Sequence, residues 1–297
     1  MPNETARAGD ANRITREYFD SLLIQMRHMG ARLPSTEVEI YGETFPTPIM
    51  TAALSHLDNQ HPDGAAEMAR GAKATGAVLW TGMGSGAELE ALVATGARTV
   101  KIIKPYADNG IIFEKLAHAE KLGALAVGMD TDHAFNGRGQ FDTVLGQKMS
   151  SKSLDEIGSF VRATKLPFII KGVLGARDAR VCRDLGVRGV VVSHHHGVLD
   201  YALPPLMALP EIVEAVGKDM PVFVDCGIET GIDAFKAMAL GATAVSVGRA
   251  LMEKLKEGGA AGVAEKIAQM TAELAGAMAR TCSPRVGEID PGLIRRR

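Results

Sequence analysis

The 297-residue sequence has few cysteines, little net charge and no long apolar segment, and each shortage excludes a class of protein. Its three cysteines are odd in number and lack CxxC spacing, which argues against a disulfide framework or a structural zinc site and fits a reducing cytoplasm. The formal net charge is −2, and no basic stripe suited to nucleic acid is present. No apolar run approaches the ~18 residues of a membrane helix, and the first ten residues are too polar for a signal peptide. We therefore expect a cytoplasmic protein that binds neither nucleic acid nor membrane.

The chain repeats one unit, a short apolar strand followed by a turn and an amphipathic helix, which is typical of parallel strands joined by helical crossovers. Eight units without a GxGxxG motif after the first strand favour a closed (β/α)8 TIM barrel over an open doubly wound sheet. The expected strands cover residues 48–54, 77–82, 99–105, 125–130, 167–173, 189–194, 221–227 and 244–251.

The segments between these strands have helical periodicity, and a glycine suited to a left-handed C-cap follows several of them. The expected helices cover residues 64–75, 86–95, 113–122, 154–164, 176–185, 206–216 and 230–240, with a C-terminal helix at 260–281. One connection, residues 131–153, is long and lacks periodicity, which is typical of a lid or a binding loop.

The N-terminal part precedes the first barrel strand. We expect a disordered leader over residues 1–12 and a single barrel domain over 13–297. A helical pattern over 13–29 predicts a helix that packs on the body. Residues 35–49 alternate on both sides of Tyr41-Gly42, which predicts a hairpin that could close the base of the barrel.

Three consecutive predicted strands deliver polar side chains at their carboxyl ends, where barrel enzymes place their active sites. These are Lys171, the run Ser193–His196, and Asp225. One histidine acting as an acid or base is favoured, although all three could simply form hydrogen bonds, as we expect for His194. Strand alternation predicts that His194 and His196 point away from His195. Without nearby cysteines or an HExxH helix, no metal site is expected.

Two further features concern anions. Lys171 follows three apolar residues, so partial desolvation would suit it to a Schiff base or to stabilising an anion, whereas its alternative is a solvated lysine at a strand end. Glycine-rich turns follow the seventh and eighth strands, and Arg249 directly follows Gly248. Barrels commonly hold a phosphate at this place, with backbone N–H groups and a cation.

Two segments, LPFIIKGVLGARDARVCRDLGVRGVVVSHHHGVLDY and MPVFVDCGIETGIDAFKAMALGATAVSVGRAL, resemble the FMN-dependent α-hydroxy-acid oxidases and dehydrogenases. A weaker resemblance extends back to Ser35. The resemblance implies an FMN cofactor, a small-molecule substrate and a homo-oligomer, tetrameric or larger.

The resemblance also implies roles for individual residues. His195 would be the catalytic base, Asp130 would hold the imidazolium that forms, and Lys171 would lie against the N1 and C2 carbonyl region of the flavin. The implied cofactor-binding residues are Ala52, Ala53, Thr81, Lys171, Ser193, Asp225, Gly227, Gly248 and Arg249.

The chain departs from the family pattern at three positions. After His195 it lacks the arginine that grips the substrate carboxylate, Lys104 replaces a tyrosine, and Glu229 replaces an arginine at the phosphate site. Lys104, Arg138 or protonated His196 could hold a carboxylate instead. We expect oxidation of an α-hydroxy acid or a related α-hydroxy carbonyl compound. The alternatives are an FMN-dependent isomerase or reductase, and a non-catalytic barrel that binds a phosphorylated ligand.

Overall fold

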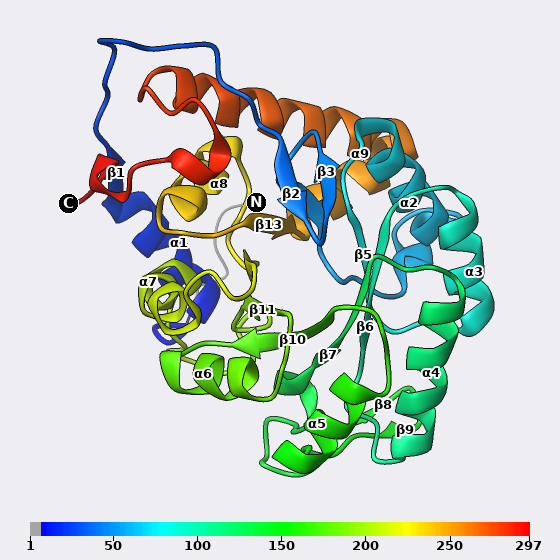
Figure 1. The fold of residues 1–297 in the computed structure, drawn as a ribbon. Helices are drawn as coiled ribbons and strands as arrows, with labels where there is room; N and C mark the ends of the chain where they lie inside the picture. Colours follow the sequence, from blue (N-terminus) through cyan, green and yellow to red (C-terminus); the bar gives the residue numbers. More distant parts are fainter. Residues whose placement is uncertain (1–6) are drawn as a thin grey trace.

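The computed structural model, which describes residues 7–297, contains an eight-stranded parallel sheet surrounded by helices (Figure 1). The strand order is β4-β13-β12-β11-β10-β7-β6-β5. The two strands at the ends of this order, β4 and β5, are also joined to each other. A parallel bridge links Leu54 to Thr81, and the Trp80 amide donates a 2.8 Å hydrogen bond to the Thr51 hydroxyl. The predicted closed barrel is therefore confirmed. Its strands are β4 (Ile49–Thr51), β5 (Leu79–Thr81), β6 (Thr99–Ile103), β7 (Ala126–Asp130), β10 (Phe168–Val173), β11 (Gly189–Val192), β12 (Val222–Val224) and β13 (Ala244–Val247).

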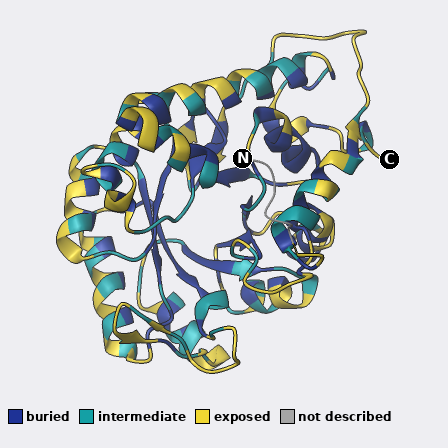
Figure 2. Ribbon diagram, turned by 180° about the vertical axis from the view of Figure 1, so that it is seen from behind, coloured by how far each residue is buried: buried dark blue, intermediate teal, exposed yellow. Residues whose placement is uncertain are grey.

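The helices lie outside the strands, with buried faces toward the sheet and exposed faces toward solvent (Figure 2). All seven predicted connecting helices are present, and glycines with positive φ follow several of them, as the pattern predicted. They are α2 (Gly64–Thr75), α3 (Gly86–Ala94), α4 (Asn109–Lys121), α5 (Leu154–Arg162), α6 (Ala176–Asp184), α7 (Pro205–Val216) and α8 (Gly231–Ala239).

The C-terminal helix begins earlier than the sequence pattern indicated. Strand β13 ends at Val247, and α9 (Arg249–Ala279) starts two residues later, with a kink at Gly258 and Gly259. The prediction of strand through residue 251 is therefore wrong. Ala250 and Leu251 are apolar because they lie on the buried face of helix α9. Arg249 consequently lies in the first turn of a helix at the barrel mouth.

The hairpin predicted around Tyr41-Gly42 is confirmed as β2 (Val38–Ile40) and β3 (Glu43–Phe45). The apolar side chains of both strands are buried in the cluster that fills the inside of the barrel. The Tyr41 hydroxyl donates a 3.0 Å hydrogen bond to the Arg188 carbonyl, immediately before β11. Because that carbonyl precedes the strand, the hairpin closes the amino-terminal end of the barrel and leaves chemistry to the carboxyl end.

The N-terminal segment differs from its prediction. Helix α1 (Ala11–Ser21) starts inside the predicted leader, because the Asp10 side chain accepts a 2.9 Å hydrogen bond from the Asn12 amide and caps it. The rest of that leader lies partly outside the described residues. The helix ends at Ser21 rather than residue 29, because β1 (Leu22–Ile24) pairs with β14 (Ile294–Arg296) near the opposite end of the chain.

The long connection 131–153 is more structured than its composition suggested. It contains a short 3-10 helix, η2 (Thr131–His133), and a small hairpin, β8 (Thr143–Val144) and β9 (Gln147–Lys148). The start of this connection lies beside the histidine turn described below. Within residues 7–297, no helix combines the length and apolar character that a bilayer crossing requires.

Candidate active site

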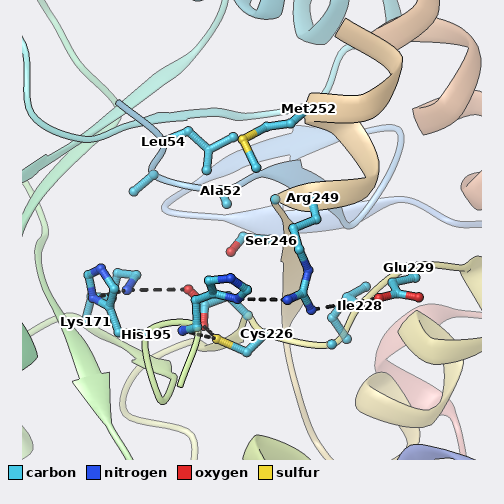
Figure 3. Close-up of a pocket in the computed structure, with 15 residues that line it drawn as sticks. Ala52, Leu54, Lys171, His195, Cys226, Ile228, Glu229, Ser246, Arg249 and Met252 are labelled. Carbon is cyan, nitrogen blue, oxygen red and sulfur yellow. Dashed lines mark hydrogen bonds and ion pairs between the residues drawn. The ribbon is translucent and has the colours of Figure 1, made fainter. Parts of the chain in front are cut away.

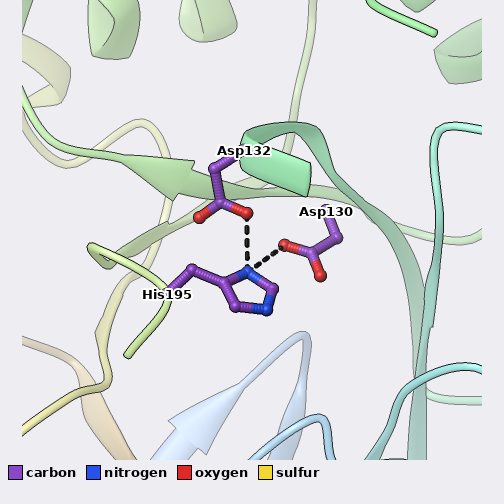
Figure 4. Close-up of side chains that lie close together, drawn as sticks. All are labelled: Asp130, Asp132 and His195. Carbon is purple, nitrogen blue, oxygen red and sulfur yellow. Dashed lines mark hydrogen bonds and ion pairs between the residues drawn. The ribbon is translucent and has the colours of Figure 1, made fainter. Parts of the chain in front are cut away.

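His195 lies at the mouth of the barrel against two carboxylates (Figure 4). Its Nδ1 is 3.1 Å from Asp130 Oδ1, at the end of β7, and 2.7 Å from Asp132 Oδ1, in η2. Lys171 Nζ, a donor, also lies 3.2 Å from Nδ1. Because two carboxylate acceptors face this nitrogen against one donor, we assign the proton to Nδ1, which leaves Nε2 as the atom that can accept another. Burial lowers the pKa of His195, but its hydrogen bonds to the two carboxylates outweigh burial and raise the pKa to about 9.

Asp130 is the centre of a buried charge network. Its Oδ2 is 2.6 Å from Lys104 Nζ, and its Oδ1 is 3.4 Å from Lys171 Nζ. Burial opposes ionisation of this carboxyl, yet Lys171 and His195 hold its pKa well below the usual range. Lys171 also lies 3.6 Å from Asp225 Oδ2, and these carboxylates raise its pKa against the cost of burial. Both Asp130 and Lys171 are therefore charged at neutral pH.

The histidine turn, residues 193–197, is strained. Strand β11 ends at Val192, and both His195 (φ 46°) and His196 (φ 59°) adopt left-handed backbone conformations that cost non-glycine residues about 1–3 kcal/mol each. Strand alternation therefore does not apply, although the two rings diverge as predicted. His195 contacts Asp130 and Asp132 at one end of the cavity, and His196 contacts Arg249 at the other end of the cavity. His194 points away from it, 2.8 Å from the Thr15 hydroxyl of α1, in the hydrogen-bonding role expected for it.

A cavity opens beside His195 (Figure 3). One wall is apolar and is formed by Ala52, Leu54 and Met252. Lys171 and His195 lie at one end, and Arg249 and Glu229 lie at the other (Figure 3). The cavity therefore suits a ligand with a flat apolar part and polar groups at both ends.

Arg249 is the cation at the far end of the cavity. Its Nη1 donates to His196 Nδ1 at 2.8 Å and to Asn12 Oδ1 at 3.2 Å, and its Nη2 is 3.8 Å from Glu229 Oε1. Gly248 caps helix α9 without a side chain, so the positive end of the helix faces the same region. Glu229 offsets part of this positive charge.

Cys226 is a further strained residue in the wall of the cavity, with φ 65°. Its thiol donates a 3.0 Å hydrogen bond to Asp225, and its sulfur accepts one from the His196 amide at 3.3 Å. Burial and the neighbouring Asp225 raise the pKa of this thiol to about 12, so it stays protonated. All three cysteines of the chain are free, in agreement with the expectation from their spacing. Cys226 thus joins the turn after β12 to the histidine turn.

Most residues named from the sequence gather here. Those that line the cavity are Ala52, Ala53, Lys171, His195, His196, Asp225, Gly227, Gly248 and Arg249. Asp130 and Ser193 lie directly behind them, where the Ser193 hydroxyl accepts a 3.0 Å hydrogen bond from the His195 amide. Thr81 is buried at the end of β5 and is not among the lining residues.

The three side chains proposed to bind a substrate carboxylate are not well placed to do so. Lys104 is paired with Asp130, and Arg138 is exposed in the connection 131–153, outside the cavity lining. Burial and Arg249 lower the pKa of His196, which accepts a hydrogen bond from that arginine and is therefore neutral at pH 7. The geometry does not support protonated His196 as an anion ligand.

Sequence analysis did not identify Asp132, Cys226, Leu54 or Met252. Asp132 was detectable only as a second carboxylate two residues after Asp130, since it lies in the 3-10 helix η2 and not on the strand. Cys226 and Met252 occupy positions that only the three-dimensional arrangement brings to the cavity.

Asp130, Asp132 and His195 also have the composition of a metal site, since one ligand atom from each lies within 4.8 Å of the others. Lys104 and Lys171 already neutralise Asp130, however, and a divalent cation there would meet two ammonium groups. The cluster is better suited to holding a protonated imidazole.

The fold and the site indicate a barrel enzyme that uses a phosphorylated cofactor. The mouth of this closed barrel holds a histidine paired with carboxylates, a buried lysine and a cationic helix terminus. A family model described as FMN-dependent dehydrogenase matches residues 3–155 and 139–296. The chain belongs to this family, the FMN-dependent α-hydroxy-acid oxidases and dehydrogenases, and is an FMN-dependent oxidoreductase that acts on a CH–OH group.

Individual relatives agree with this assignment. Glycolate oxidase 3 of Arabidopsis thaliana is 31% identical over 268 residues, which is 78% of this chain and 72% of the relative. L-lactate oxidase of Alicycliphilus denitrificans is 30% identical over 293 residues, covering 87% of this chain and 80% of the relative. A tyrosine-to-phenylalanine mutant of mandelate oxidase with a monooxide FMN adduct superposes with a TM-score of 0.89 at 29% identity, over 98% of this chain and 93% of that one.

The donor set fits FMN, which has a flat ring at one end and a phosphate at the other. The apolar wall and the buried cation Lys171 suit the ring, and Arg249 with the N-terminus of α9 suits the phosphate. Glu229 fits less well, since its carboxylate lies beside the cation that a phosphate would use.

Proposed function

We propose that this chain oxidises a small α-hydroxy acid, or a related α-hydroxy carbonyl compound, with His195 as the base and FMN as the cofactor. The observation that carries the proposal is His195 at the edge of the cavity, with Nδ1 held by two carboxylates and Nε2 left for a substrate proton. The names of the relatives, which are glycolate, lactate and mandelate oxidases, support the same substrate class.

His195 performs the proton chemistry in this proposal. The substrate loses two electrons and two protons on oxidation. Nε2 takes one of these protons, from the hydroxyl or from the α-carbon, and the other would leave with the electron pair to the bound flavin. The imidazolium that results is stabilised by Asp130 and Asp132, at 3.1 and 2.7 Å from Nδ1. Bound FMN supplies the two-electron acceptor.

The remaining polar residues bind and orient. Lys171 would supply a buried positive charge to stabilise the negative charge of a reduced flavin, and Asp225 and Asp130 keep this lysine protonated. Gly227, Gly248 and Arg249 would hold the phosphate end. Ala52 and Ala53 would lie along the ring, and the remaining residues proposed for the cofactor site are Thr81 and Ser193.

The substrate carboxylate has weaker recognition than the family pattern supplies. Lys104 is neutralised by Asp130, and Arg138 could reach the mouth only through movement of the connection 131–153. We therefore expect a hydroxy acid and its neutral ester to be oxidised at rates that differ by less than about tenfold. This corresponds to a contribution of less than about 1.4 kcal/mol from recognition of the carboxylate charge.

The test is an absorption spectrum of the purified protein before and after anaerobic addition of matched hydroxy acids and hydroxy esters. Loss of the oxidised flavin bands with any of these compounds supports the proposal. Bands that persist with all of them would favour an isomerase or reductase on the same barrel. A protein that stays colourless after reconstitution with FMN would favour a non-catalytic barrel that binds a phosphorylated ligand.

We also propose a cytoplasmic homo-oligomer, tetrameric or larger. Support comes from the resemblance and from an exposed apolar segment beside the histidine turn, including Val198, Leu199 and Tyr201, which are 55%, 67% and 70% exposed. Light scattering coupled to size-exclusion chromatography measures the assembly, and a monomer at micromolar concentration would contradict it.

A further inference from the structure

His195 has two carboxylate partners, and they are not equivalent. Asp132 Oδ1 lies 2.7 Å from Nδ1, whereas Asp130 Oδ1 lies 3.1 Å away (Figure 4). We propose that Asp132 is the positioning carboxylate that keeps a proton on Nδ1 of His195 and stabilises its cationic form. The catalytic consequence of this inference rests on the proposed function, but the interaction itself does not.

Asp130 is committed elsewhere. Each of its oxygens faces an ammonium group, with Lys104 Nζ at 2.6 Å from Oδ2 and Lys171 Nζ at 3.4 Å from Oδ1. Lys104 and Lys171 compete with His195 for this carboxylate, so Asp130 stabilises an imidazolium less than an unshared carboxylate would. Asp130 therefore contributes to holding His195, but it is divided among three cationic partners.

Asp132 has no competing cation among the hydrogen bonds and ion pairs of residues 7–297. Its Oδ1 contacts His195, and its Oδ2 is buried without a hydrogen-bond partner in that part of the chain. A buried carboxylate with one unpaired oxygen is costly unless a cation lies beside it. Protonated His195 is that cation, so the charge of Asp132 and the proton of His195 stabilise each other.

The local backbone makes room for this contact. Gly172 has φ 101°, and a Cβ atom there would lie 2.5 Å from Asp132 Oδ2. The register between β10 and β11 shifts between Lys171 and Val173, at this same glycine. The Thr131 hydroxyl donates a 3.1 Å hydrogen bond to the Lys171 carbonyl and fixes η2 against β10. Asp132 is thus held in place by three neighbouring features of the fold.

The other charged and titratable groups near His195 come from every element around it. They are Lys104 after β6, Asp130 on β7, His133 in η2, Lys171 on β10, and Asp225 after β12. The His133 ring lies 4.9 Å from that of His195, and burial together with Lys104 lowers the pKa of His133, which leaves it neutral. Burial raises the pKa of Asp132 to about 6, so its carboxylate is ionised at neutral pH.

The test is the pKa of His195 measured by NMR on 15N-histidine-labelled holoprotein, in the unmodified chain and in Asp132→Asn. Loss of the carboxylate should lower the pKa of His195 by about 1–3 units. The acid limb of the rate of flavin reduction by a hydroxy acid should move down by the same amount, and the plateau rate should fall at least about tenfold, because the imidazolium loses its partner. Asp132→Ser serves as a second variant in case Asp132→Asn does not fold.

Asp142→Asn is the matched control. Asp142 lies in the same connection and is 3.4 Å from His133 Nδ1, so the variant changes charge in this loop without touching His195. The proposal is overturned if the pKa of His195 is unchanged in both Asp132 variants, or if Asp142→Asn lowers it equally. If no hydroxy acid reduces the flavin but the NMR shift occurs, the proposed function fails while the role of Asp132 stands.

Discussion

Replacing Glu229 by Gln should tighten FMN binding and leave riboflavin binding unchanged. Glu229 Oε1 lies 3.8 Å from Arg249 Nη2, at the end of the cavity proposed for the phosphate. The Glu229 side chain is 48% exposed, so bulk water is the appropriate dielectric, and two unit charges at that separation interact by about 1 kcal/mol. Freeing Arg249 from this partner for an anionic phosphate should therefore lower the Kd for FMN about sixfold.

The assay is a fluorescence titration of apoprotein with FMN and, separately, with riboflavin, which lacks the phosphate. The gain for FMN should shrink at high salt, because the Debye length falls from about 10 Å at 0.1 M to about 3 Å at 1 M. Equal changes for FMN and riboflavin, or no change for either, would refute the assignment of this end of the cavity to the phosphate. Glu257→Gln, on the exposed side of α9, controls for a general change in net charge.

Four further predictions concern His195, Lys171 and Cys226. His195→Ala should retain flavin but lose about 10²–10⁴-fold in the rate of anaerobic flavin reduction, and full activity would refute its role as base. The base must be neutral and the pKa of His195 is raised to about 9, so the rate of flavin reduction should climb with pH toward 9. Stopped-flow measurements across pH 6 to 10 would show this rise. The stability that protonated His195 contributes is complete below about pH 6.5 and lost above pH 9. Lys171→Met removes a cation from two buried carboxylates, so it should lower the free energy of unfolding by about 3–5 kcal/mol and weaken flavin retention, both measurable by denaturant titration with and without FMN. Cys226→Gly should be more stable than Cys226→Ala by about 1 kcal/mol in calorimetry, because the residue has φ 65°, and the reverse order would contradict the strain argument.

The barrel was predictable because its signals are local. Each strand is a short apolar run, and each of several helices ends at a glycine such as Gly76 or Gly186, both of which have positive φ. Three polar residues lie at or near the carboxyl ends of β7, β10 and β12, and they could also be placed at one mouth because parallel strands end on the same side. They are Asp130, Lys171 and Asp225.

What the sequence could not predict depends on long-range contacts. Helix α1 ends early because Leu22 pairs with Arg296, 274 positions away along the chain, and no local pattern encodes that partner. The left-handed backbone of His196 depends on contacts with Cys226 and Arg249 from other elements. Lys104 could be read as a substrate ligand until its contact with Asp130 was known.

The pairing of β1 with β14 has a consequence for the order in which the chain folds. Strand β1 directly follows α1, and α1 supports the histidine turn through Thr15 and through Asn12, whose side chain donates a 3.0 Å hydrogen bond to the His196 carbonyl. The partner strand, Ile294–Arg296, lies 274 positions from Leu22 at its far pair, so this contact closes a loop that contains the whole barrel. Contacts of such high sequence separation form late in folding, so the histidine turn reaches its final form only after the barrel strands have paired.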